Sequence, residues 1–201
     1  MWMVFFKGMG LSAGLIMAIG SQNAHVLRMG LRRQHVGLTV LTCIACEIAL
    51  ISAGILGVGT LIASHASLLT LARWGGAAFL FWYGWRAWRS ALQTQTLHVS
   101  QGEQLPRRAQ ALAAVLGVTL LNPHVYLDTV ILLGAVGGQQ AGTGKFWFGL
   151  GAIANATIWY LALGYGARLL APVFENPQAW RRLDAAIGLM MWGLALSLLL
   201  T

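Results

Sequence analysis

Residues 121–129 read Leu-Asn-Pro-His-Val-Tyr-Leu-Asp-Thr, and a shorter string of the same kind, Asn-Ala-His-Val, occupies residues 23–26. Both strings belong to apolar stretches that are long enough to cross a membrane. Pro123 lacks a backbone donor and clashes with the preceding helical turn, and residues 20–23, Gly-Ser-Gln-Asn, are poor helix formers. The two strings therefore predict two broken helices at membrane depth, which are tolerated where the freed backbone groups face protein or a water-filled cavity.

A second similarity follows each string farther along the chain. Residues 73–78 read Arg-Trp-Gly-Gly-Ala-Ala and residues 182–187 read Arg-Leu-Asp-Ala-Ala-Ile, and Gly84 and Gly193 each follow the arginine by eleven positions. Two matches in the same order predict an internal duplication with three spans in each half. Because three is odd, the two halves face opposite ways across the bilayer, as in transporters that hold their substrate near the midplane.

The composition excludes a water-soluble globule. Of the 201 residues, 58% are hydrophobic and only 9% are charged, and the mean hydropathy is +0.69, whereas soluble domains carry about 25% charged residues. Six spans of ~20 residues fill nearly the whole chain, so no soluble domain is expected. No phosphate-binding loop of the form G-x-x-x-x-G-K-[ST] is present, and ATP is therefore not the expected energy source.

We predict an all-α integral membrane protein with six transmembrane helices, arranged as two inverted three-helix repeats. The first repeat takes residues 1–90, a cytoplasmic loop takes residues 91–108, and the second repeat takes residues 109–201. Hydropathy and charge place the six spans at Trp2–Leu27, Val36–Ala63, Leu68–Trp88, Ala109–Gly134, Phe146–Pro172 and Leu183–Leu200.

Basic residues set the predicted orientation. Nine of the thirteen lysines and arginines lie in or beside the first, third and fifth connections: Arg28, Arg32, Arg33, Arg86, Arg89, Arg107, Arg108, Arg181 and Arg182. Because Lys and Arg of short loops stay on the cytoplasmic side, both termini are predicted outside, in the periplasm. The tryptophans lie in the spans or at their ends rather than among these arginines, so a nucleic-acid partner is not expected.

Two acids lie inside predicted spans. Glu47 is near the centre of the second span and Asp128 is in the middle of the fourth. A central carboxylate costs about 2.5–3.5 kcal/mol on the insertion scale, so both should face the protein interior. One helical face of the second span agrees with this, because it carries Glu47 together with small or apolar residues: Cys43, Leu50, Gly54 and Gly57.

The residues alone leave three interpretations of these acids open. They could be structural, paired with Arg73 or with backbone groups. They could form a proton relay. They could instead bind a cationic substrate and exchange it for protons, because burial disfavours an unpaired carboxylate. Asn155 stands in the fifth span roughly where Glu47 stands in the second, and it would add a hydrogen bond.

Metal, cofactor and enzyme chemistry have little support in the sequence. Cys43 and Cys46 form C-x-x-C within an apolar run and are expected to pack as small core residues. His25 and His124 occupy matching repeat positions, but no C-x-x-C-H haem signature accompanies them. We expect no metal, no cofactor and no enzymatic activity, since the chain has neither a nucleophile elbow nor an H-E-x-x-H motif.

The chain resembles the lysine/arginine exporter (LysE) family of bacterial inner-membrane proteins, especially its arginine-exporter branch. The resemblance covers essentially the whole length, and residues 122–129, Asn-Pro-His-Val-Tyr-Leu-Asp-Thr, are its most specific element. The other matching stretches are residues 20–33, residues 73–80 with Tyr83-Gly84, residues 164–167, Leu183-Asp184 and Met191-Trp192.

The resemblance implies export of arginine and lysine from the cytoplasm, driven by the proton-motive force, with the functional acids at Glu47 and Asp128. Three departures stand out. The family pattern usually has Pro at position 21 and commonly has Asp at position 47, where this chain has Ser21 and Glu47. The fifth-span pattern Ala-Ser-x-x-Trp-Phe appears here at residues 155–160 as Asn-Ala-Thr-Ile-Trp-Tyr.

These observations together predict a multi-pass exporter of the bacterial inner membrane that works by alternating access. Glu47 and Asp128 are expected to bind the cationic side chain of the substrate and to couple protons. The two helix breaks are expected to hold the backbone amino and carboxylate groups of the substrate. The remaining predicted substrate contacts, in and near these breaks and in the fifth span, are Gln22, Asn23, Asn122, Pro123, Tyr126 and Asn155.

Two alternatives stay open, an exporter of neutral amino acids such as homoserine or threonine, and a channel. The expected partners are the amino acid, protons and membrane lipid. The Gly10-x-x-x-Gly14 spacing also permits pairing with a second copy of the chain.

Overall fold

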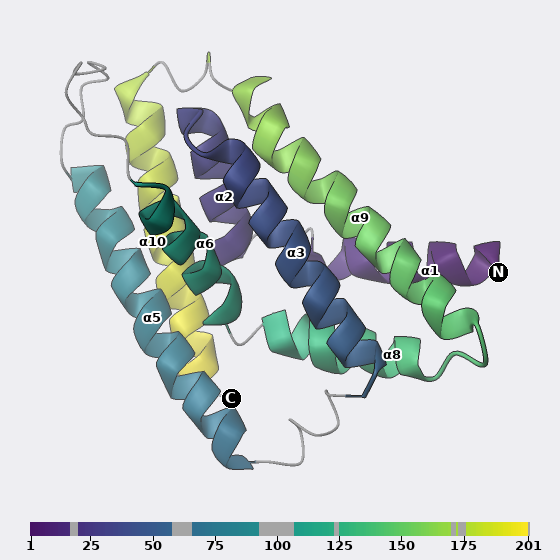
Figure 1. The fold of residues 1–201 in the computed structure, drawn as a ribbon. Coiled ribbons are helices and arrows are strands. Elements are labelled where there is room, and N and C mark those ends of the chain that lie inside the picture. Colours follow the sequence, from purple (N-terminus) through teal and green to yellow (C-terminus); the bar gives the residue numbers. More distant parts are fainter. Residues whose placement is uncertain are drawn as a thin grey trace.

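The computed structural model describes residues 1–16, 20–57, 66–92, 107–122, 125–169, 172 and 176–200. Every regular element in these ranges is a helix (Figure 1), which agrees with the predicted all-α class. In chain order they are α1 (Trp2–Ile16), α2 (Ser21–Arg32), α3 (Val36–Ile55), α5 (Ala66–Leu92), α6 (Arg108–Leu120), the π-helix η1 (Tyr126–Leu133), α8 (Gly134–Gly138), α9 (Gly144–Gly166) and α10 (Pro177–Leu200).

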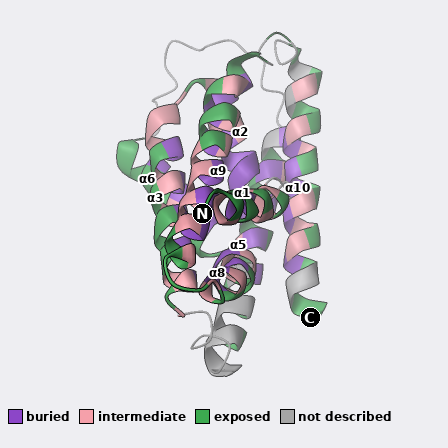
Figure 2. Ribbon diagram, turned by 90° about the vertical axis from the view of Figure 1, so that its right-hand side faces the viewer, coloured by how far each residue is buried: buried purple, intermediate pink, exposed green. Residues whose placement is uncertain are grey.

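The helices expose apolar side chains and bury polar ones. Figure 2 shows exposed positions along the outer faces of the helices and buried positions between them. Leu41, Trp74 and Phe81 are more than half exposed, whereas Glu47 and Asp184 are buried. An apolar exterior of this kind suits lipid rather than water.

Length and composition qualify two helices as membrane spans by themselves, α3 and α9 extended by the following turn (Gly144–Leu169). A third candidate is the bent pair of α1 and α2. The predicted six-span arrangement is neither confirmed nor contradicted by these helices and stays a prediction.

Both predicted helix breaks are present, but the first lies earlier than expected. The axes of α1 and α2 meet at 81°, and Gly20 has extended backbone, with φ −113° and ψ −175°. The prediction that residues 21–23 belong to the break was wrong, because they form the first turn of α2. A first turn tolerates Ser, Gln and Asn, since its backbone N–H groups have no partner within the helix.

The second break also occurs within the predicted fourth span. α6 ends at Leu120, Asn122 is outside any helix, and the chain resumes helical structure at Val125. Pro123 and His124 lie outside the described residues.

The helices form a pair and a cluster. α5 and α10 lie side by side, and α3 packs on α9, η1 and α8 (Figure 1). α1 and α8 cross the long helices, and Figure 2 shows both nearly end-on. Glycines permit the closest approaches: a Cβ built on Gly84 of α5 would lie 3.1 Å from the Gly188 carbonyl oxygen of α10, and the reverse distance is the same.

The buried face of α3 is largely the predicted one. Cys43, Glu47 and Gly54 are buried, while Ile51 is fully buried in place of the half-buried Leu50. Cys43 and Cys46 are free thiols. No other described part of the chain packs against Gly10 or Gly14, because an added Cβ at either would meet nothing within 4 Å.

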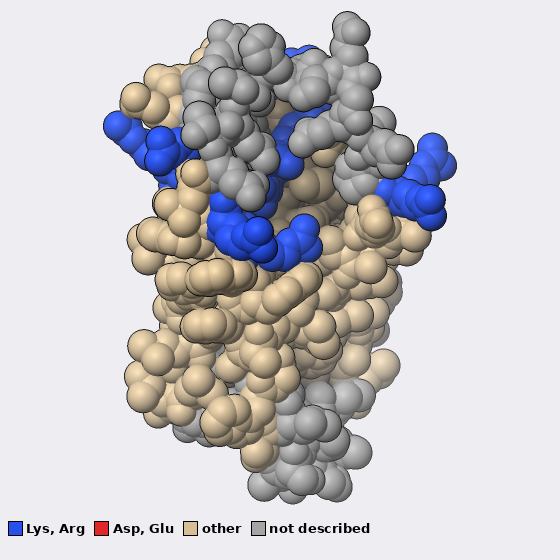
Figure 3. Space-filling view, turned by 90° about the vertical axis from the view of Figure 1, so that its left-hand side faces the viewer, with Lys and Arg blue, Asp and Glu red and all other residues tan. Residues whose placement is uncertain are grey.

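The described arginine side chains gather at one end of the molecule, whereas the two lysines, Lys7 in α1 and Lys145 at the start of α9, lie apart from them. Figure 3 shows the arginines in the upper part of one face, above a broad area without charge. The C-terminal ends of α2 and α9 and the N-terminal end of α10 lie at that height (Figure 1). We call this the arginine-rich end, and it brings together the predicted first and fifth connections.

The contact between α3 and α8 generates a test of the packing. A Cβ on Gly134 would lie 2.6–2.7 Å from backbone atoms of Gly54, whereas a Cβ on Gly138, one turn later, would lie 3.6 Å from the nearest atom, the Ile55 carbonyl oxygen. Gly134→Ala should destabilise the protein by about 1–3 kcal/mol through overpacking. Gly138→Ala should be neutral or stabilising by up to ~1 kcal/mol. Thermal unfolding in detergent checks both, and equal melting temperatures would contradict the close contact.

Candidate functional site

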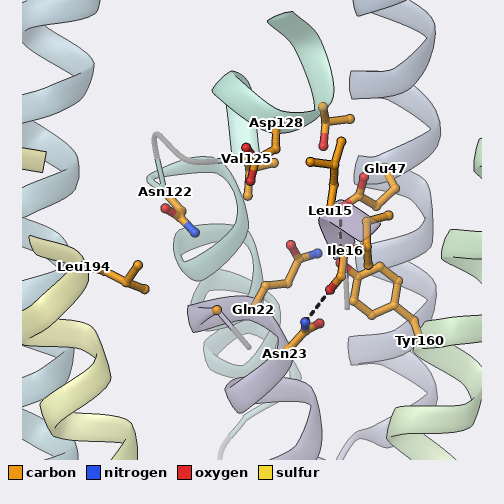
Figure 4. Close-up of a pocket in the computed structure, with 12 residues that line it drawn as sticks. Leu15, Ile16, Gln22, Asn23, Glu47, Asn122, Val125, Asp128, Tyr160 and Leu194 are labelled. Carbon is orange, nitrogen blue, oxygen red and sulfur yellow. Dashed lines mark hydrogen bonds between the residues drawn. The ribbon is translucent and has the colours of Figure 1, made fainter. Parts of the chain in front are cut away.

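A cavity of about 200 Å³ lies where the two broken helices meet (Figure 4). By the same measure a cavity needs roughly 10–15 Å³ to hold one water, so this one has room for a small polar molecule. Its wall combines acids, amides and apolar side chains: Leu15, Ile16, Gly20, Gln22, Asn23, Glu47, Asn122, Val125, Asp128, Thr129, Tyr160 and Leu194.

The structure brings together five of the residues that the sequence singled out. Gln22 and Asn23 come from the first turn of α2, Glu47 from α3, Asn122 from the second break and Asp128 from η1. In Figure 4, Glu47 lies on one side of the cavity, Asn122 and Asp128 lie on the other, and Gln22 extends between them. Asp128 belongs to a π-helix, a rare conformation that often occurs at functional sites.

Other predicted site residues lie elsewhere. Tyr126 is half-buried in η1 but does not line the cavity. Asn155 is buried against α1, where its Nδ2 donates to Ser12 Oγ at 3.1 Å, and Ser12 in turn donates to the Ala152 carbonyl at 3.2 Å. These bonds hold α1 against α9. Pro123 and the side chain of Arg73 lie outside the described part of the chain.

Glu47 is the most deeply buried acid of the cavity wall. Its side chain is 2% exposed, and Oε1 accepts a hydrogen bond of 3.1 Å from the Tyr160 hydroxyl. Oε2 has no hydrogen-bond partner within the described residues. The Nε2 of Gln22 is likewise buried without a partner there. An unpaired buried polar atom costs about 1–3 kcal/mol, so this acceptor and this donor are suited to a polar ligand.

Asn23 holds the first helix break. Its Nδ2 donates to the carbonyl of Ile16, the last residue of α1, at 2.7 Å, and its Oδ1 accepts from Trp159 Nε1 at 3.2 Å. The carbonyl of Ile16 has no partner within its own helix. Asn23 therefore connects the end of α1 to α2 and α9.

Asn122 ties the two breaks to each other. Its Nδ2 donates to Ser21 Oγ at 3.0 Å, and Ser21 donates to the Val118 carbonyl of α6 at 3.1 Å. Proline, the residue expected at position 21 from the resemblance noted above, has no hydroxyl and could make neither bond. Ser21 thus joins the start of α2 to the end of α6.

Two polar pairs lie between the cavity and the arginine-rich end, along the rest of α2. His25 Nδ1 and the Tyr83 hydroxyl are 2.8 Å apart, and Arg28 Nη2 lies 3.4 Å from Asp184 Oδ2. The first pair connects α2 to α5 and the second connects α2 to α10. Sequence reasoning missed both pairs. Asp184 is a third acid inside a predicted span. Because a charge in the membrane is costly, its position could have indicated that it has a partner within the protein.

Tyr160 and Thr129 of the cavity wall were also missed. Nothing in the sequence indicates which hydroxyls face the cavity, because that depends on how α9 and η1 rotate against α3.

The chain is similar to known transport proteins over nearly its whole length. Residues 13–201 match the family described as LysE type translocator. The chain is 41% identical over 195 residues to the arginine exporter protein ArgO of Serratia proteamaculans, covering 97% of this chain and 95% of that protein. It is 39% identical over 198 residues to the arginine exporter protein ArgO of Escherichia coli, covering 98% and 94%. No solved structure matches.

The tie between the two breaks can be measured by a double-mutant cycle. Ser21→Ala and Asn122→Ala should each destabilise the protein by about 0.5–1.5 kcal/mol, the net value of one hydrogen bond. Because the two residues share a bond, the double variant should lose less than the sum. Ser52→Ala, at an exposed position of α3, is the control and should change nothing. Thermal unfolding in detergent supplies the values, and strict additivity would show that the bond contributes nothing.

The ion pair on α2 predicts a contrast between two arginines. Arg28→Met removes a partner of the buried Asp184 and should destabilise the protein by about 1–3 kcal/mol. Arg33→Met, at the exposed end of the same helix, removes the same charge and should have little effect. The same unfolding assay compares them, and equal losses would point to net charge rather than the ion pair.

Proposed function

This chain belongs to the LysE family of translocators, and we propose that it exports basic L-amino acids, arginine and lysine, from the bacterial cytoplasm in exchange for protons. The observation that carries the proposal is the cavity whose wall presents two carboxylates, Glu47 and Asp128, where two broken helices meet. Arginine export is what the names of the relatives state.

The charges of the cavity suit a basic amino acid. Such a molecule carries an α-ammonium group, an α-carboxylate and a second cation on its side chain. Glu47 and Asp128 supply two negatively charged acceptors for the two cations, while Nε2 of Gln22 supplies a neutral donor for the α-carboxylate. A neutral amino acid would engage only one of the two acids.

Exchange for protons follows from burial. A carboxylate removed from water is costly unless a cation or a proton neutralises it. Glu47 and Asp128 would therefore hold the substrate in one state and protons in the other. Moving a +1 substrate outward opposes an inside-negative potential by about 2.3 kcal/mol per 100 mV, and one proton moving inward makes the cycle electroneutral.

The membrane topology that fits this function is the predicted one: six spans in two inverted repeats, in the bacterial inner membrane, with alternating access to the cavity. The arginine-rich end would face the cytoplasm, because Lys and Arg are retained on that side. Both termini would then be periplasmic. Its support is the gathering of arginine side chains at one end of the molecule.

Transport in proteoliposomes tests the proposal. Vesicles are loaded with labelled arginine, and a pH gradient that is acidic outside is imposed. Glu47→Gln and Asp128→Asn should each lower efflux at least tenfold, because each removes a charge-assisted contact worth about 1.5–3 kcal/mol. Glu103→Gln, which removes a carboxylate from the predicted loop, is the matched control and should transport normally.

Unimpaired efflux in both cavity variants would refute their role in the site. Competition by unlabelled arginine, lysine and threonine separates a basic from a neutral substrate. Efflux that ignores the pH gradient and appears as single-channel current in a planar bilayer would indicate a channel instead.

A further inference from the structure

We propose that Tyr160 is a positioning residue that sets how the site contacts the cation of its substrate. By bonding one oxygen of Glu47, Tyr160 leaves the other as the oxygen with its full acceptor capacity, and this uneven carboxylate lets the site accept a lysine ammonium group nearly as well as an arginine guanidinium. This inference rests on the proposed function and concerns the same cavity.

The geometry isolates one oxygen atom. Tyr160 of α9 and Glu47 of α3 both line the cavity and lie on the same side of it (Figure 4). The Tyr160 hydroxyl donates to Oε1 at 3.1 Å, while Oε2 is buried and has no hydrogen-bond partner in the described residues. Because Glu47 is 2% exposed and Tyr160 is also 2% exposed, bulk water does not compete for this bond.

A carboxylate with one oxygen already bonded treats the two side-chain cations differently from a free carboxylate. Guanidinium binds best when its two parallel N–H groups meet both oxygens of a carboxylate, whereas an ammonium group acts as a compact point charge. The Tyr160 hydroxyl occupies one acceptor site of Oε1 and fixes the orientation of the carboxylate, so such a fork can use only Oε2 in full. The contact with Glu47 therefore loses its advantage for arginine and keeps its value for lysine.

The length of the acid matches the position of the hydroxyl. Replacing Glu47 by aspartate would withdraw the carboxylate by one carbon–carbon bond of roughly 1.5 Å, which takes Oε1 beyond hydrogen-bond reach of Tyr160. The bond therefore needs both the longer acid and the hydroxyl, which supply its two partners.

Four variants in the proteoliposome assay test the pair. Tyr160→Phe removes the bond that holds Glu47 in place, so it should raise the KM for lysine severalfold with little change in the maximal rate, whereas the second contact that a guanidinium gains should offset most of this loss for arginine. It should also shift the arginine-to-lysine ratio of kcat/KM toward arginine by roughly threefold or more, because both Glu47 oxygens become fully available. Glu47→Asp breaks the same bond from the other side and should shift the ratio in the same direction.

The double variant gives the sharpest outcome. Glu47→Asp with Tyr160→Phe removes both partners, so no hydroxyl is left without an acceptor, and it should recover most of the affinity that Glu47→Asp alone loses. Its preference should remain shifted toward arginine. Tyr165→Phe, which deletes a hydroxyl from the same helix outside the cavity wall, is the control and should match the wild type.

The inference is overturned if Tyr160→Phe leaves the ratio unchanged, or if the losses of the single variants simply add in the double variant. Should Tyr160→Phe fail to reach the membrane, the ratio in Glu47→Asp decides the matter alone, because that variant keeps Tyr160. Glu47→Gln separates the two levels of proposal. If Glu47→Gln exports normally, the proposed site is wrong. If Glu47→Gln loses export while Tyr160→Phe behaves like the wild type, the site stands and only the proposed role of Tyr160 is wrong.

Discussion

A carboxylate buried among apolar helices is the constraint on which the rest of this structure depends. Glu47 is almost inaccessible, and an isolated charge there would cost several kcal/mol. The fold meets that cost in part, with one hydrogen bond from Tyr160 to Oε1. It meets the remainder by placing Oε2 at a polar cavity instead of against lipid. The location of the cavity therefore follows from the location of the acid.

α2 is the element that makes the cavity wall polar. It is the least apolar of the described helices, and most of its residues are buried. Its side chains reach four other helices: Ser21 reaches α6, Asn23 reaches α9, His25 reaches α5 and Arg28 reaches α10. A polar helix in an apolar surrounding is stable only when neighbours supply such partners. α2 thus connects the cavity to the arginine-rich end through polar contacts along its length.

The site differs from its expected form in what each amide does. Asn155 was expected to contact substrate, yet it bonds to Ser12, and Asn23, which lines the cavity, also holds the carbonyl that α1 leaves unpaired. Both uses satisfy backbone or side-chain groups that a broken or closely packed helix would otherwise leave without partners. Gln22 is the amide whose donor stays free at the cavity. The composition of the break was thus informative about polarity, while the role of each residue depended on its neighbours.

Patterns within the sequence by themselves determined the helical class, the two breaks and the inward placement of Glu47 and Asp128. Each depends on a local property: apolar length, a proline or glycine at a fixed position, or the cost of a charge in lipid. Only the tertiary structure decided that α2 resumes at Ser21, that the Tyr160 hydroxyl bonds to Glu47, and that Arg28 pairs with Asp184. These partners are separated by more than a hundred residues, and the rotation of each helix about its axis selects them. That rotation is set by packing across the whole bundle, which no local pattern encodes.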